Sequence, residues 1–171
     1  SRRAAEVIQR LRSLVRSGSV AKARHDIRNI VRNVLLLFEY EIKKGNIQIE
    51  YSPPKRAIEL FVDDIQIQQV LVNLVKNSLD ALEEADIANG TIRIEIAARG
   101  DELQVSVSDN GPGIPEPGRE LLFEAFHTTK PDGVGLGLSI CRSIASAHGG
   151  TLKYSASPRG GARFTLGLPL E

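Results

Sequence analysis

The sequence has a single cysteine, contains neither methionine nor tryptophan, and is only 5% aromatic. With Cys141 alone, no disulfide can form within the chain, which predicts a reducing, cytoplasmic setting. The chain has 22 basic and 21 acidic residues, which gives a net charge of +1. Its overall charge therefore does not favour binding to nucleic acid or to a membrane surface. No apolar run approaches the roughly 20 residues that a membrane helix needs, and no signal peptide pattern is present.

The chain nevertheless has ample material for one buried core, because 42% of its 171 residues are hydrophobic. Apolar residues spaced three and four apart predict amphipathic helices over residues 2–16, 26–44, 64–86 and 136–148. Alternating patterns predict strands over residues 47–51, 58–62, 91–97, 103–108, 151–156 and 162–168. This order predicts a two-layer α/β sandwich, in which helices cover one face of a single mixed, mostly antiparallel sheet.

The predicted helix over residues 64–86 carries an amide at every fourth position. Gln69, Asn73 and Asn77 therefore lie on one helix face. A buried amide without partners costs on the order of 1–3 kcal/mol, so the stripe indicates either a solvated polar face or a ligand site. An amide oxygen also suits Mg²⁺, which prefers oxygen ligands and usually keeps its waters and substrate phosphates. The sequence alone leaves both alternatives open.

A tight turn follows the predicted strand over residues 103–108. Residues 108–113 read Ser-Asp-Asn-Gly-Pro-Gly, which sets the carboxylate of Asp109 at the mouth of the turn. An amino group of a ligand could donate a hydrogen bond to it there. A plain Asp-Asn-Gly turn without function is the alternative, because such turns are common.

A glycine-rich loop, Gly-Val-Gly-Leu-Gly-Leu, occupies residues 133–138 at the start of the last predicted helix. It lacks the lysine of a Walker loop and the glycine spacing of a dinucleotide fingerprint. A helix N-terminus nonetheless favours phosphate through its free amides and its positive dipole end. Alone, the loop is a weak indication of a phosphate site.

Taken in order, these features resemble the ATP-binding domain of bacterial sensor histidine kinases. The matching elements are that family's N box at Asn77, its G1 box at residues 109–113, its F box at residues 123–130 and its G2 box at residues 133–138. The resemblance covers about residues 45–169. It implies the Bergerat fold of the GHKL superfamily, with ATP or ADP and Mg²⁺ as ligands.

Two further segments extend the resemblance. Residues 160–164 look like the family's last glycine box. Residues 128–130 and 147–150 resemble the oxygen- and nitrogen-sensor branch of the family.

The resemblance assigns roles to matching positions. It implies that Asn77 holds Mg²⁺ against the triphosphate and that Asp109 accepts a hydrogen bond from the adenine amino group. The segment from about Ile114 to Gly133 would form a lid, with Lys130 as its phosphate cation unless that lysine is merely solvated. The implied nucleotide contacts are Asn73, Asn77, Asp80, Asp109, Gly111, Gly113, Ile114, Thr128, Thr129, Lys130, Gly133, Gly135, Leu136, Gly137 and Leu138.

Asn73 distinguishes this chain from other families with the same fold. Gyrase, Hsp90 and mismatch-repair type ATPases carry a glutamate at this position, where it activates water as a general base. An amide cannot take up that proton, so the resemblance implies transfer to a histidine, with Asn73 and Lys130 as catalytic candidates. Asp80 departs from the basic residue found there in many family members, which predicts weaker nucleotide binding.

His25 imitates the start of an acceptor motif, but the acceptor is expected elsewhere. Two antiparallel helices of about eight turns need roughly 60 residues, and fewer positions separate His25 from Asn77. We therefore expect residues 1–18 to be the end of a dimerisation helix and residues 19–171 to be the catalytic domain. The acceptor histidine would lie upstream of Ser1.

The leading hypothesis is a catalytic fragment that binds Mg·ATP and phosphorylates a histidine on the dimerisation domain. The phosphoryl group would pass to the receiver domain of a response regulator, and the parent would be a homodimer with no nucleic-acid or direct membrane contact. The alternative is a nucleotide-sensing module that controls docking to a partner without transfer. Asn77 and Asp109 fit both functions, whereas Thr129 and Lys130 favour transfer.

Overall fold

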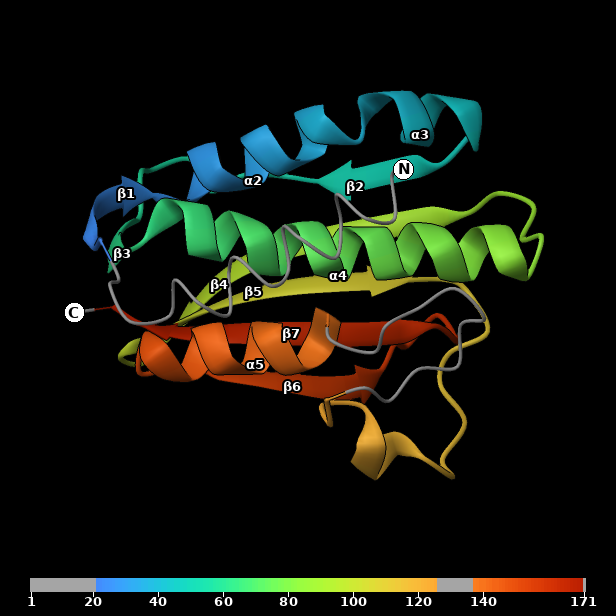
Figure 1. Cartoon of the computed structure of the whole chain (residues 1–171). Coiled ribbons are helices and arrows are strands. Elements are labelled where there is room, and N and C mark those ends of the chain that lie inside the picture. Colours follow the sequence, from blue (N-terminus) through green and yellow to red (C-terminus); the bar gives the residue numbers. More distant parts are fainter. Residues whose placement is uncertain (1–20, 126–136, 171) are drawn as a thin grey trace, which may run out of the picture.

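The computed structural model describes residues 21–125 and 137–170. Its main element is a five-stranded sheet in the order β2-β4-β5-β7-β6 (Figure 1). Only β2 and β4 are parallel, so the prediction of a mixed, mostly antiparallel sheet is confirmed. The strands are β2 (Gln48–Tyr51), β4 (Thr91–Arg99), β5 (Glu102–Asp109), β6 (Thr151–Ala156) and β7 (Ala162–Pro169).

The central strands β4 and β5 bury alternate side chains. Ile92 and Ile94 on β4 are at most 3% exposed, and Val105 and Val107 on β5 at most 1%. Ile94 and Val107 lie directly opposite each other in the antiparallel ladder. Because side chains alternate between the two faces of a strand, these apolar residues of the hairpin all lie on the face that packs against the helices.

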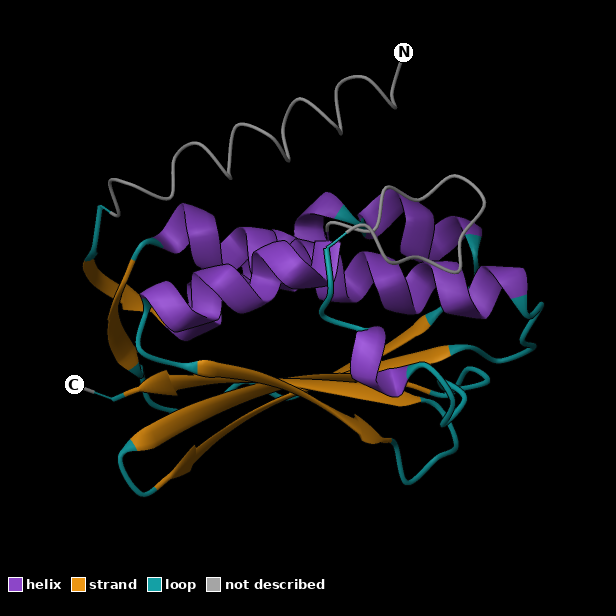
Figure 2. Ribbon diagram, turned by 60° about the horizontal axis from the view of Figure 1, so that its bottom comes forward, coloured by secondary structure: helices purple, strands orange, loops and turns teal. Residues whose placement is uncertain are grey.

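The α-helices of the described residues lie on one face of the five-stranded sheet (Figure 2). The central one, α4, begins after Asp63, whose Oδ1 accepts a hydrogen bond from the N–H of Gln66 at 3.2 Å and so caps the helix. It packs against α2, α5 and β5, and it buries Ile67, Leu74 and Val75 completely. The helices are α2 (Ile27–Leu37), α3 (Glu39–Lys44), α4 (Asp64–Glu84) and α5 (Gly137–Ala147).

The prediction of one helix over residues 26–44 is wrong, because two helices occupy this segment. The chain leaves the helical region at Phe38, where φ is −103° and ψ is 10°. No glycine or proline marks this break. Phe38 and Ile42 continue the apolar period across it, so the pattern alone could not reveal it.

The prediction of a single sheet is also incomplete. Strand β3 (Glu59–Val62) pairs antiparallel with β1 (Ala23–Asp26) in a separate two-stranded sheet. The sequence does not predict β1, because Ala-Arg-His-Asp shows no alternation of apolar residues. His25 therefore lies on a strand, with its Nε2 3.8 Å from the Asp64 carboxylate.

Helix α5 ends at the predicted glycine pair. Gly149 adopts a φ of +69°, and the N–H of Gly150 donates a hydrogen bond to the carbonyl of Ala145 at 2.8 Å, which closes the helix. The helix predicted over residues 2–16 lies outside the described residues. Within the described ranges, no helix has both the length and the apolar character needed to cross a bilayer.

Candidate functional site

Asn73 lies near the middle of α4 and faces α5. It is only 8% exposed, and its Nδ2 donates a hydrogen bond to the Sγ of Cys141 on α5, with 3.4 Å between the atoms. The solvated-face alternative is therefore excluded for Asn73. Gln69 and Asn77, one turn to either side, are half-buried.

The first turn of α5 adjoins the same amide. A Cβ added to Gly137 would lie 4.0 Å from the Oδ1 of Asn73. Since Nδ2 is engaged by Cys141, the amide oxygen is the atom that faces the start of α5. The positive end of the helix dipole lies at this helix start and favours an anion. Gly137 and the half-buried Leu138 thus lie beside the amide stripe.

Asp109 ends β5 and is 6% exposed. Its Oδ1 accepts hydrogen bonds from the N–H groups of Gly111 at 3.0 Å and Ala162 at 3.3 Å. Within the described part of the chain, both hydrogen bonds given to this carboxylate end on Oδ1. Backbone donors therefore fix the group through one oxygen, and Oδ2 keeps its capacity to accept from a ligand.

A second glycine turn, between β6 and β7, supports this carboxylate. A Cβ on Gly161 would overlap the main-chain oxygen and Oδ1 of Asp109, so only glycine fits there. Gly113 has a φ of +75°, and a Cβ on it would lie 3.1 Å from the carbonyl oxygen of Gly160. The sequence reasoning missed Gly161 and Ala162 as supports of Asp109. The sequence marks residues 160–164 as a glycine box, but only the pairing of β5 with β7 shows that this turn lies against Asp109.

The turn after β5 also packs on α4. A Cβ on Gly111 would lie 3.7 Å from the Cβ of Ala81. Ala81 follows Asp80 and lies about one turn beyond Asn77, so the predicted residues of α4 and of this turn are neighbours. Ile114, a little farther along, is partly buried against the core.

Thr128, Thr129, Lys130, Gly133, Gly135 and Leu136 lie outside the described residues. Their roles stay predictions.

The resolved pKa shifts belong to another part of the molecule. Hydrogen bonds from the Arg28 guanidinium hold the pKa of Asp26 below its ordinary value of 3.8. Burial raises the pKa of Tyr51 on β2. Both groups lie away from Asn73 and Asp109, near the start of α2 and on β2.

The donor set of the site suits one kind of metal. The described residues contain no group of three or more His, Cys, Asp or Glu side chains that could hold a metal ion. A metal bound near Asn73 and Asn77 would need amide oxygens, water and oxygens of a substrate. That coordination is typical of Mg²⁺, which protein side chains seldom enclose.

Comparison with known proteins shows the family and the fold to which this chain is similar. Residues 62–171 match the family model described as histidine kinase-, DNA gyrase B-, and HSP90-like ATPase. The chain is 34% identical over 173 residues to the sensor protein TdiS of Thauera aromatica, covering 98% of this chain and 31% of TdiS. The catalytic domain of histidine kinase ThkA, in a nucleotide-free form, is similar with a TM-score of 0.77 and 36% identity, covering 86% of this chain and 95% of that one.

Two longer solved proteins are also similar. Full-length ShkA in complex with AMPPNP matches at 26% identity and a TM-score of 0.77, over 96% of this chain and 35% of ShkA. Histidine kinase ThkA in complex with the response regulator protein TrrA matches at 29% identity and a TM-score of 0.78, over 98% of this chain and 48% of that one. The chain spans between 18% and 33% of the length of three curated relatives that it matches.

Proposed function

This chain belongs to the family of histidine kinase-, DNA gyrase B- and HSP90-like ATPases, and we propose that it binds ATP together with Mg²⁺ in the site described above. It is the catalytic domain of a two-component sensor histidine kinase. One observation carries the proposal. The carboxylate at the end of β5, the amide stripe of α4 and the N-terminal turn of α5 are neighbours. A Cβ added to Gly111 would lie 3.7 Å from the Cβ of Ala81, and one added to Gly137 would lie 4.0 Å from the Oδ1 of Asn73.

The adenine would bind at Asp109. Its Oδ1 is occupied by two backbone N–H groups, so Oδ2 would accept from the amino group of the base. Guanine carries an oxygen where adenine has this amino group, so the same acceptor disfavours it. Gly111 and Gly113 would let the backbone pass close to the base, and Ile114 would contact it.

Asn77 would hold Mg²⁺ through its amide oxygen, with Asp80 nearby on α4. When bound, the ion would supply positive charge that offsets the negative charge of the triphosphate. The N-terminus of α5 would meet the phosphates from the other side with N–H groups of Gly137 and Leu138. The expected contacts from Thr128 to Leu136 would complete the phosphate site, with Lys130 as its cation.

Asn73 supports transfer rather than hydrolysis. Its oxygen faces the start of α5 and can accept a hydrogen bond from water, but an amide has no basic atom to take the proton. Water held there would not be activated, so the γ-phosphoryl group would persist until a better nucleophile arrives. A neutral histidine nitrogen is such a nucleophile.

We infer that this histidine lies on a dimerisation domain that precedes the catalytic domain, and that residues 1–18 are its end. His25 lies on β1, which pairs with β3. The acceptor is expected on a helix, so His25 does not suit that role. The parent would be a cytoplasmic-facing homodimer of the oxygen- and nitrogen-sensor branch. It would pass the phosphoryl group to a response regulator, the class of partner named in the ThkA complex.

Calorimetric titration of the chain with ATP and Mg²⁺ tests the site. Asp109→Asn should lose most of the affinity, because an amide held through its oxygen would present N–H to the adenine amino group. Asn77→Ala should lose the part of the affinity that depends on Mg²⁺. Asn33→Ala, at an exposed position of α2, is the matched control. Wild-type affinity in both site variants would contradict the assignment.

Phosphotransfer is tested separately with labelled ATP. The chain should label a dimerisation domain taken from the parent kinase when the two are mixed. Label on the chain alone, without that domain, would contradict an upstream acceptor.

A further inference from the structure

Five side chains form one continuous row of edge-to-face, tilted and cation–π contacts, called the stack below, beside the candidate site. Its centre is Phe164, whose ring centroid lies 5.4 Å from that of Tyr154 and 6.3 Å from that of Phe123. An arginine lies at each end, with the Cζ of Arg119 5.3 Å from the centre of the Tyr154 ring and the Cζ of Arg142 5.3 Å from that of Phe123. At these distances a guanidinium is attracted by the negative face of the ring.

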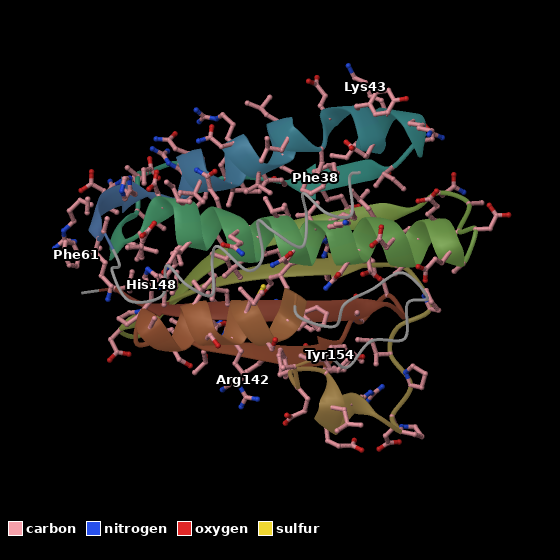
Figure 3. The ribbon with its side chains drawn as sticks, in the orientation of Figure 1. Phe38, Lys43, Phe61, Arg142, His148 and Tyr154 are labelled. Atoms are coloured by element: carbon pink, nitrogen blue, oxygen red, sulfur yellow. The ribbon has the colours of Figure 1, made fainter. Side chains whose placement is uncertain are left out.

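The stack joins elements that are distant in the sequence. Arg119 begins the short 3-10 helix η2 (Arg119–Leu121), and Phe123 follows it. Tyr154 belongs to β6 and Phe164 to β7, where the two residues are register partners. Arg142 projects from α5, and Figure 3 shows it with Tyr154 on the side of the molecule that carries η2. The segment after the Asp109 turn is thereby held to the sheet and to α5.

Arg119 also contacts the Asp109 turn directly. Its Nε donates a hydrogen bond to the carbonyl of Ile114 at 2.9 Å. Ile114 follows Gly113, whose backbone lies close to the carbonyl of Gly160. Since Arg119 is half-buried and its guanidinium stacks on Tyr154, the carbonyl of Ile114 is tied through one side chain to the rigid edge of the sheet.

We propose that Arg119 is a positioning residue for the nucleotide base, acting through Ile114, with Tyr154 as its platform. The proposal rests on the proposed ATP site. Arg119 does not touch the base; it holds the exit of the turn so that Gly113 and Ile114 keep the spacing from Asp109 that adenine requires. Arg142 on α5 adds to this support by packing on the ring of Phe123, which follows η2.

This role predicts which part of the ligand is affected. Losing the Arg119 contacts would loosen the base end of the site but leave the amides of α4 and the N-terminus of α5 in place. Affinity for ATP should therefore fall while affinity for inorganic tripolyphosphate, which has no base, stays the same. A general loss of folding would lower both.

The test measures the Kd of ATP and of tripolyphosphate, each with Mg²⁺, together with the Tm of every variant of the 171-residue chain. Arg119→Ala should raise the Kd of ATP about tenfold, equivalent to about 1.4 kcal/mol, with an unchanged Kd of tripolyphosphate. Arg119→Lys should recover part of the ATP affinity, because an ammonium can still reach the carbonyl and the ring. Arg99→Ala, an exposed arginine at the end of β4, is the matched control and should bind both ligands as the wild type does.

The platform is tested with Tyr154. Its hydroxyl is buried and has no hydrogen-bond partner among the described residues, so Tyr154→Phe should keep the wild-type Kd, whereas Tyr154→Leu should raise it. In the double variant Arg119→Ala/Tyr154→Leu, the increases in the Kd of ATP should not add, because both substitutions remove the same contact between Arg119 and Tyr154. Wild-type ATP affinity in Arg119→Ala, or equal losses of ATP and tripolyphosphate, would overturn the proposal. A wild-type chain without affinity for ATP would instead overturn the proposed function.

Discussion

The backbone N–H of Asp63 donates a hydrogen bond to Nε2 of His148, with 3.1 Å between the nitrogens. Because Nε2 accepts, the ring carries its proton on Nδ1, which donates to the carbonyl of Ile144 at 2.8 Å. The Oδ2 of Asp63 meanwhile accepts from the N–H of Ala21 at 3.1 Å. One imidazole thus joins the end of α5 to the cap of α4 (Figure 3).

His148→Leu should lower the free energy of unfolding by about 1–3 kcal/mol, because the buried N–H of Asp63 loses its acceptor. Urea unfolding followed by circular dichroism measures the loss. His25→Leu is the control, since the side chain of His25 is 32% exposed and lies on the outer two-stranded sheet. A loss in His25→Leu as large as that in His148→Leu would contradict this role of the ring.

The ion pair at the start of α2 should make stability depend on pH. The Nη2 of Arg28 lies 2.8 Å from Oδ2 of Asp26, and its hydrogen bonds lower the pKa of that carboxyl from 3.8. A pKa lowered in the folded state means that ionised Asp26 stabilises the fold above pH 3.8 and that this contribution is lost as the pH falls through the lowered value.

Asp26→Asn should therefore be less stable than the wild type at neutral pH, and the difference should narrow below pH 3.8. Arg28→Gln should behave alike, because it removes the partner. Unfolding free energies from urea titrations between neutral and acidic pH measure the difference. A constant gap between wild type and Asp26→Asn at every pH would disprove the linkage.

Gly161→Ala should displace the Asp109 carboxylate more than Gly160→Ala does. The added Cβ would overlap the main-chain oxygen and Oδ1 of Asp109, so β7 or the carboxylate must move. We expect a loss of unfolding free energy of about 3 kcal/mol or more and a large loss of ATP affinity. In Gly160→Ala, the Cβ meets nothing within 4 Å but φ is +97°, so only backbone strain of about 1 kcal/mol is expected.

Calorimetry with ATP and urea unfolding compare these two glycine variants. Equal effects in Gly160→Ala and Gly161→Ala would mean that backbone strain, rather than contact with Asp109, accounts for both.

Elements whose buried faces repeat regularly could be predicted from the sequence. Helix α4 and strands β4 and β5 turn unbroken apolar periods toward one core, and their predicted bounds lie within about two residues of those observed. Strand β1 could not be predicted, because it is polar and is held by pairing with β3. The break at Phe38 likewise follows from packing, since the apolar period continues through it.

The site residues likewise fall into a part that could be predicted from the sequence and a part that could not. The amides of α4 and the turn after β5 are local runs of residues, so their chemistry could be predicted. Their supports are not local. Cys141 orients Asn73 across two helices, and Ala162 and Gly161 reach Asp109 through the β5–β7 ladder. Arg119 has no motif, and only the fold brings it to Tyr154.

The identity of residue 73 should decide how fast the domain hydrolyses ATP without an acceptor. Asn73 faces the start of α5 with an oxygen that cannot take a proton. Asn73→Glu would supply a carboxylate one turn before Asn77, where related ATPases carry their general base. General-base catalysis typically contributes about 10²–10⁴-fold, and a side chain in an unadapted site should recover at least about tenfold of it.

Asn73→Gln is the matched control, because it has the length of glutamate without a basic atom. Both variants lose the hydrogen bond to Cys141 and should be destabilised, so stability alone cannot separate them. Phosphate release in the presence of Mg²⁺ and saturating ATP, normalised to folded protein, measures hydrolysis. A rate increase in Asn73→Glu and none in Asn73→Gln supports the assignment, because only the added base differs. Equal rates in the two variants would mean that residue 73 does not limit the activation of water.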